Sequence, residues 1–108
     1  MRIYCKGIMI TDELSIANNF TSRFIGLMGR KYLDKKEGLL LVKCNSIHSF
    51  FMKFPMDVVY LSENMDVLHI ETIKPWKIGK RVRKAANVLE LAVGSANGVF
   101  IGDKILLE

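Results

Sequence analysis

The sequence has few of the residues that cross-link small proteins or bind metal ions. Cys5 and Cys44 are the only cysteines, and there are two histidines and one tryptophan. No cysteine or histidine pair has the spacing of a zinc site, so we expect no metal site and no cofactor. A disulfide can be drawn in principle, but we favour two reduced thiols packed as small hydrophobic side chains.

Long apolar runs are also missing. A membrane-spanning helix needs roughly 20 consecutive apolar residues, and no run in this sequence approaches that length. The first residues, Met1 to Gly7, lack a signal-peptide core followed by a small-residue cleavage site. These absences favour a cytoplasmic protein with no membrane partner.

Internal repeats, low-complexity tracts and interdomain linkers are absent too. The 108 residues, 50% of them hydrophobic, match the size of one domain with an ample core. We therefore predict a single globular domain over residues 1–108. The net charge of +5 and the pI of about 9.4 are compatible with an anionic partner, although many basic domains have none.

The most informative stretch runs from Ile47 to Tyr60 and is rich in aromatic residues. Pro55 cannot donate to a strand ladder, so it separates two extended pieces, 46–52 and 56–61. The second piece is apolar on both faces, which predicts a central strand. Asp57 lies at its start, where a buried carboxylate needs hydrogen-bond donors or a rim open to solvent.

Other short runs predict a chain made mostly of strands. We place further strands at residues 2–11, 38–42, 67–73, 87–93 and 104–107. Residues 56–61 and 67–73 form a hairpin. Glu90 stands among apolar residues and requires an arginine, lysine or backbone donor. The pattern predicts an α+β fold that is mainly antiparallel β, a small closed or partly open barrel with one or two short helices.

One of these short helices is predicted at residues 21–30, where Thr21 or Ser22 supplies the N-cap. Arg23 and Arg30 flank it. They either hold an anionic ligand or are two solvated arginines, and the sequence leaves both interpretations open.

Residues 74–84 form a basic segment in which proline and glycine prevent regular structure. Its candidate contact residues for an anion or a nucleic acid are Trp76, Lys80, Arg81, Arg83 and Lys84. Basic residues around an exposed tryptophan can grip phosphates and stack a base. We favour a solvated loop whose tryptophan covers the core, because one aromatic ring is not a stacking platform. Nucleic acid is therefore a candidate partner but not the favoured one.

Four pieces of the sequence, in order, resemble one known family. They are RFIGLMGR (23–30), GLLL (38–41), IHSFFMKFPMDVVY (47–60) and VLELAVG (88–94), the last followed by Gly102-Asp103. Together they resemble the bacterial and archaeal family called domain of unknown function 192 over nearly the whole chain. The resemblance implies a compact β-rich α+β domain. It supplies no activity, because the family is functionally uncharacterised.

Three hypotheses about function follow. The first is a non-catalytic binding module with a polar cleft for a small anionic or polar ligand. Its candidate ligand-binding cluster is Arg23, Arg30, His48, Lys53, Asp57 and Glu90. A purely structural interpretation competes, in which Arg23 or Lys53 pairs with Asp57 or Glu90 as a buried ion pair that fixes the register of the barrel.

The second hypothesis is an enzyme in which His48 is the general base and Asp57 orients it. No nucleophile motif or phosphate loop supports it, so no catalytic residue is assigned. The third hypothesis is weak nucleic-acid binding through residues 74–84, with an affinity that falls steeply as salt rises.

Overall fold

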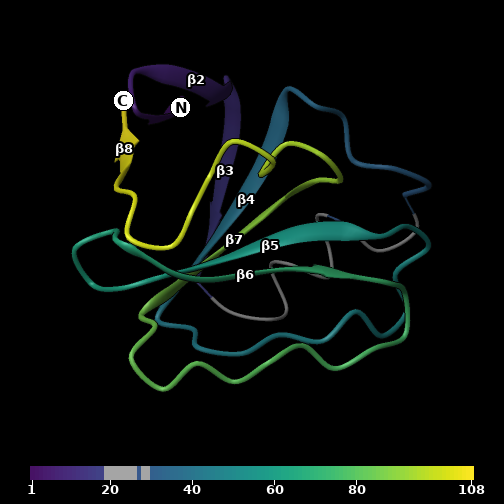
Figure 1. Cartoon of the computed structure of the whole chain (residues 1–108). Helices are drawn as coiled ribbons and strands as arrows, with labels where there is room; N and C mark the ends of the chain where they lie inside the picture. The colour runs from purple at the N-terminus through teal and green to yellow at the C-terminus, as the bar shows by residue number, and fades with distance from the viewer. Residues whose placement is uncertain (19–26, 28–29) are drawn as a thin grey trace.

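The fold consists of two β-sheets, and long irregular connections link strands of the larger one (Figure 1). The computed structural model describes residues 1–18, 27 and 30–108. Their strands are β1 (Ile3–Cys5), β2 (Ile8–Thr11), β3 (Glu13–Ala17), β4 (Glu37–Val42), β5 (Met56–Leu61), β6 (Val67–Ile73), β7 (Asn87–Ala92) and β8 (Ile105–Leu107). Among the described residues only Leu27 is helical. The helix predicted at 21–30, with Arg23, lies mostly outside them.

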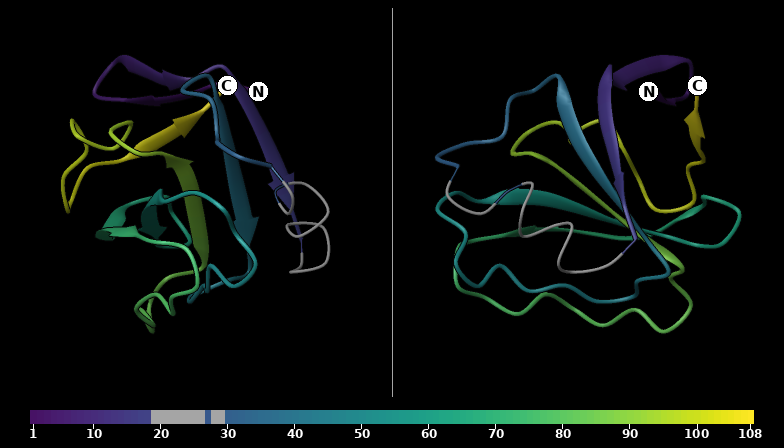
Figure 2. Two further views of the ribbon diagram at one scale, coloured as in Figure 1. Left: turned by 90° about the vertical axis from the view of Figure 1, so that its right-hand side faces the viewer. Right: turned by 180° about the vertical axis from the view of Figure 1, so that it is seen from behind.

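The larger sheet has five strands in the order β3-β4-β7-β5-β6. All neighbouring strands are antiparallel except β3 and β4, which run parallel with Ala17 opposite Leu41. The smaller sheet has the order β2-β1-β8, so the first strand pairs with the last. Arg2 and Glu108 exchange backbone hydrogen bonds of 2.9 and 2.8 Å. The two chain ends therefore lie side by side (Figures 1 and 2).

The prediction of mainly antiparallel β structure is confirmed, but the sheet does not close into a barrel. β3 and β6 are the edges of the larger sheet, and each has one neighbour. The strands that would have to bridge these edges, β1, β2 and β8, pair with one another instead. The result is an open sheet with other parts of the chain on both faces (Figure 2).

Most predicted strands are confirmed, and the exceptions have local causes. Residues 2–11 form two strands because Lys6 and Gly7 both have positive φ, 53° and 76°, which turns the chain sharply. The extended piece predicted at 46–52 is irregular, and its one bridge joins His48 to Ile78. This segment covers a sheet rather than extending one.

Alternation along the strands of the larger sheet separates two hydrophobic clusters. Met56, Val58 and Tyr60 of β5 point into one cluster, while Val59 and Leu61 point into the other. We call the two sides of the larger sheet the loop-covered face and the sheet-covered face, after what packs on each.

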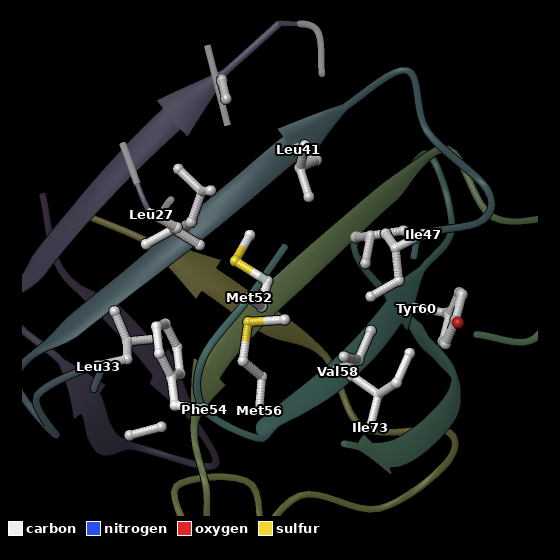
Figure 3. Packing of buried hydrophobic residues seen from close by; sticks show 14 of the residues in the cluster. Leu27, Leu33, Leu41, Ile47, Met52, Phe54, Met56, Val58, Tyr60 and Ile73 are labelled. Carbon is white, nitrogen blue, oxygen red and sulfur yellow. The ribbon is translucent and has the colours of Figure 1, made fainter. Parts of the chain in front are cut away.

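On the loop-covered face, irregular connections fill the space above the strands (Figure 3). They contribute Leu33, Ile47, Met52 and Phe54, all less than 9% exposed. The sheet-covered face is closed by the smaller sheet and the turn after β7. These contribute Ile3, Cys5, Ala96, Val99 and Ile105.

Candidate functional site

The two carboxylates of the predicted cleft are separated by the larger sheet. Asp57 in β5 and Glu90 in β7 are 4% and 0% exposed. Glu90 stands opposite Val58 and Leu39, which point into the cluster on the loop-covered face. Asp57 alternates with Val58 and so faces the other side. Side chains on opposite faces of a sheet cannot contact the same small ligand.

Hydrogen bonds within the protein satisfy Asp57. Its Oδ1 accepts the Thr72 hydroxyl at 2.8 Å, and its Oδ2 accepts the backbone N–H groups of Gly94 and Ala96 at 2.9 and 3.1 Å. These bonds fasten the turn after β7 to the start of β5. The hydrogen-bond donors expected for Asp57 are therefore present, and they come from two segments that Asp57 holds together.

The remaining charged residues of the predicted cleft lie at separate places. Arg30 binds Glu37 at the start of β4 through two nitrogens, at 2.8 and 2.5 Å. That bond lowers the pKa of the Glu37 carboxyl. Lys53 is exposed, and Arg23 lies outside the described residues. The described members of the set therefore do not converge on one cleft.

The connection after β4 (residues 43–55) and the basic segment 74–84 are joined to each other along part of their length. The N–H of Gly79 donates to the carbonyl of Ile47 at 2.9 Å, and the N–H of Val82 to that of Asn45 at the same distance. Both segments run together beside the larger sheet in two views (Figures 1 and 2). The basic segment is therefore an irregular loop, as predicted, with a defined backbone partner.

Ser49 joins residues 43–55 to the basic segment through several hydrogen bonds, which we call the Ser49 clamp. Its side chain is fully buried, and its hydroxyl donates to the carbonyl of Lys74 at 2.5 Å and accepts the N–H of Lys77 at 2.9 Å. Its backbone carbonyl accepts the N–H of Trp76 at 2.9 Å. Buried polar groups need such partners, so Ser49 fixes the backbone on both sides of Trp76.

Glu71 provides a second attachment between the basic segment and the sheet. One of its carboxylate oxygens, Oε2, accepts the Tyr60 hydroxyl at 2.5 Å and the N–H of Lys80 at 2.8 Å. Figure 3 shows Tyr60 at one end of the core cluster with its hydroxyl pointing away from the other labelled side chains. Burial raises the pKa of Tyr60, and the hydrogen bond to Glu71 raises it further.

This raised pKa predicts a loss of stability in alkali. The unfolded chain ionises Tyr60 near pH 10 while the folded chain keeps it neutral, so the contribution is complete below pH 10 and is lost as pH rises. The free energy of unfolding is expected to fall by about 1.4 kcal/mol per pH unit above pH 10 from this group. Tyr60→Phe should remove that slope in denaturant titrations, whereas Tyr32→Phe, at a 65% exposed site, should keep it. Equal slopes in both variants would contradict the assignment.

Four aromatic rings meet where the two segments join, and we call them the ring cluster. His48 stacks on Phe50 with centroids 4.6 Å apart, Phe50 lies 6.1 Å from Trp76, and Phe51 lies 4.7 Å from Trp76. Phe51 and Trp76 are 55% and 57% exposed. The cluster is thus a surface feature supplied by two segments that are distant in sequence.

The two most exposed rings of the cluster stand on unusual backbone. Phe51 and Trp76 have φ of 68° and 62°, a conformation that is an outlier for bulky residues. Such strain persists only where the surroundings enforce it, and it gathers at functional sites. The expectation that Trp76 covers the core is wrong, because the Ser49 clamp and this backbone direct the indole outward.

Exposed cations lie close in sequence to the rings of the cluster. Lys74 and Lys77 flank Trp76, and Lys53 follows Phe51 by two positions. The rest of the basic segment adds further exposed cations: Lys80, Arg81, Arg83 and Lys84. Among the described residues none of these seven side chains has an ion-pair partner. They remain available to an anionic ligand.

Two other kinds of site are not found in the described part of the chain. Residues 1–18, 27 and 30–108 contain no group of three or more His, Cys, Asp or Glu placed to hold a metal ion. No helix within those residues has the length and apolar character needed to cross a membrane.

Comparisons with known proteins identify the family. The model of DUF192, described as "Uncharacterized ACR, COG1430", matches residues 5–107. The chain belongs to the DUF192 family. The predicted resemblance to domain of unknown function 192 is thereby confirmed.

Relatives of this DUF192 chain extend over most of its length. It is 35% identical to UPF0127 protein PF1050 of Pyrococcus furiosus over 105 residues, which cover 93% of this chain and 90% of the relative. It is 32% identical to UPF0127 protein PH1112 of Pyrococcus horikoshii, covering 93% and 91%. A protein of unknown function from Novosphingobium aromaticivorans has a similar crystal structure, with a TM-score of 0.81 at 19% identity, covering 98% and 84%. That last likeness shows the fold alone.

Sequence reasoning singled out His48 and Trp76 of the ring cluster but missed its two phenylalanines and the residues that hold it in place. Ser49, Phe50, Phe51 and Glu71 were not among the candidate residues. A signal existed for the rings, since Phe50, Phe51 and Trp76 precede or lie among lysines. What the sequence could not supply was the pairing of residues 45–49 with 76–82, because backbone bonds across so long a separation have no local pattern.

Proposed function

We propose that this DUF192 domain is a non-catalytic binding module for single-stranded nucleic acid, and that the ring cluster with the exposed cations close to it in sequence is the binding surface. The observation that carries the proposal is the pair of exposed rings, Phe51 and Trp76, held on left-handed backbone 4.7 Å apart. Bases of any sequence have a π-face, so exposed aromatic side chains bind single strands without needing base-edge hydrogen bonds.

The charges support an anionic polymer rather than an apolar partner. Lys53, Lys74 and Lys77 lie next to the rings in sequence, and the basic segment continues with four more exposed cations. A single-stranded nucleic acid whose bases stack on the rings would place its phosphates along the basic segment. Residues 74–84 contain no acidic residue that would repel it. The earlier objection, that one ring is no platform, does not apply to four rings in contact.

A catalytic role finds less support. The Nδ1 of His48 accepts the N–H of Phe50 at 3.3 Å, while Asp57 is occupied by Thr72, Gly94 and Ala96. No hydrogen bond joins His48 to Asp57, both of which are described residues, and Asp57 points to the sheet-covered face. A general base and the carboxylate that orients it must be within hydrogen-bond reach.

We also place the protein in the cytoplasm, which the two thiols of Cys5 and Cys44 favour.

The test uses the only tryptophan in the chain as its reporter. Titrating a 12-residue oligouridine into the protein is expected to quench Trp76 fluorescence. The association constant should fall with salt, with a log–log slope of about −2 to −4 for three to six phosphates contacted. Trp76→Ala, followed by the anisotropy of a labelled oligonucleotide, should weaken binding about 5- to 100-fold, the effect of one lost stacked base.

A matched control is Tyr32→Ala, which removes a 65% exposed ring far along the chain from the cluster. It should bind like the parent. Equal weakening by both variants, or an affinity independent of salt, would refute the proposed surface. Self-association that Trp76→Ala abolishes, without any oligonucleotide binding, would assign the ring cluster to a protein interface instead.

A further inference from the structure

A pocket of about 450 Å³ lies beyond the ends of the parallel strands β3 and β4, and no residue of the ring cluster is among those that line it. Asn18 follows β3 directly, Lys43 and Cys44 follow β4, and Ala86 precedes β7. Its volume falls in the range of small-molecule sites, roughly 300–1,000 Å³. Of the residues predicted for ligand binding from the sequence, those that the structure describes do not line it.

The backbone of the pocket wall is fixed by the fold. Lys43 has a φ of 55°, which turns the chain sharply as it leaves β4. The N–H of Cys44 donates to the carbonyl of Ala86 at 2.9 Å, and the Cys44 thiol donates to the carbonyl of Ser46 at 2.9 Å. A preformed wall of this kind lets a ligand bind without a large ordering cost.

The described residues that line the wall offer hydrogen-bond donors, and none of them is acidic. Its polar side chains come from Asn18, Asn45 and Ser46, and Lys43 adds a cation. Within the described residues, the backbone N–H groups of Asn45 and Ser46 have no acceptor in the protein. Arg83 and Lys84 are exposed immediately before Ala85, another lining residue. Donors and cations without a competing carboxylate favour an anion.

We propose that this pocket is a second binding site, which takes a small phosphorylated ligand. A phosphate monoester carries a charge of about −1.5 to −2 at neutral pH and three acceptor oxygens, which suit the unpaired N–H groups and Lys43. Leu41 and Ala85 form part of the apolar floor of the pocket. None of the residues that line the pocket belongs to the ring cluster, and Arg83 and Lys84 of the basic segment are the residues that the two proposals share.

Cys44 reports on occupancy of this pocket. Its thiol is half-buried in the wall, whereas Cys5 is 3% exposed in the core and serves as an internal reference. Alkylation by iodoacetamide is followed at each cysteine by mass spectrometry. Millimolar ribose 5-phosphate is expected to slow alkylation of Cys44 about fivefold, in proportion to site occupancy, while ribose leaves the rate unchanged. Uridine 5′-monophosphate should protect like ribose 5-phosphate if the phosphate is what the pocket recognises.

Variants separate this site from the ring cluster. Lys43→Gln should reduce the protection, whereas Lys36→Gln, at another exposed lysine, should preserve it. Trp76→Ala should preserve it as well, so a failed oligonucleotide experiment leaves this proposal standing. Protection by ribose equal to that by ribose 5-phosphate would overturn the proposal, and so would the absence of protection by both phosphorylated probes.

Discussion

Replacing Asp57 by alanine is expected to lower the free energy of unfolding by about 3 kcal/mol, because it leaves hydrogen-bond donors inside the protein without an acceptor. The carboxylate is 4% exposed and accepts the Thr72 hydroxyl and the N–H groups of Gly94 and Ala96. Thr72 is exposed and can bind water instead, but Ala96 is 5% exposed and would lose its acceptor. Denaturant titration measures the loss, and amide hydrogen exchange should accelerate at Gly94 and Ala96.

Two further variants distinguish this anchor from a general effect of charge. Asp57→Asn keeps one acceptor oxygen for the N–H groups of Gly94 and Ala96. It should therefore lower the free energy of unfolding by less than Asp57→Ala does. Asp66→Ala removes a carboxylate whose partner is Lys104, in a pair 3.4 Å long with side chains 44% and 54% exposed. Such an exposed ion pair contributes little to stability, so Asp66→Ala should lower the free energy of unfolding by less than about 1 kcal/mol. If Asp66→Ala cost as much as Asp57→Ala, the anchoring role of Asp57 would be wrong.

The strands could be predicted because their residue pattern records which faces are buried. Residues 56–61 are all less than 9% exposed, as an apolar run on both faces indicates. Glu90, expected to stand among apolar residues, is 0% exposed. For Asp57 the sequence left open either hydrogen-bond donors or a rim open to solvent, and the structure shows three donors at 4% exposure. The barrel was not predictable, because strand patterns do not say which edges pair, and here β1 pairs with β8 across almost the whole chain.

The candidate site was harder to predict, because its side chains owe their positions to contacts between distant segments. The sequence shows which residues of one strand share a face, because side chains alternate along a strand. It does not show that positions 57 and 90, in neighbouring strands, face opposite sides of the sheet. That depends on the register, with Val58 rather than Asp57 opposite Glu90. The ring cluster likewise depends on Ser49 meeting residues 74 and 77, a contact between segments 25 and 28 positions apart.

These contacts attach the basic segment to its neighbours at defined points, while its cations stay exposed to solvent. Ser49 holds it near Trp76, and Glu71 holds it at Lys80. A surface that is ordered before it binds loses less conformational entropy on binding. The aromatic residues and the clamps that fix them therefore act together, and a change at a buried clamp should also alter binding at the exposed rings.

Gly79→Ala is the sharpest test of this coupling, and it is expected to destabilise the protein by about 2 kcal/mol through overpacking. A Cβ at this position would lie 2.8 Å from the Tyr60 hydroxyl, 3.2 Å from Glu71 Oε2 and 3.2 Å from Ile47. Tyr60 is fully buried and cannot swing away. The basic segment has to move outward instead, which strains the bond from Gly79 N–H to Ile47 and should shift the emission of Trp76.

Gly98→Ala is the matched control, because a Cβ there meets nothing within 4 Å. It should change the free energy of unfolding by less than about 1 kcal/mol and leave Trp76 emission as it is. Adding Tyr60→Phe to Gly79→Ala removes the oxygen that the new methyl group meets, so the double variant should recover part of the loss. A Gly79→Ala protein as stable as the parent, with unchanged emission, would mean that the segment is not packed against Tyr60 as described.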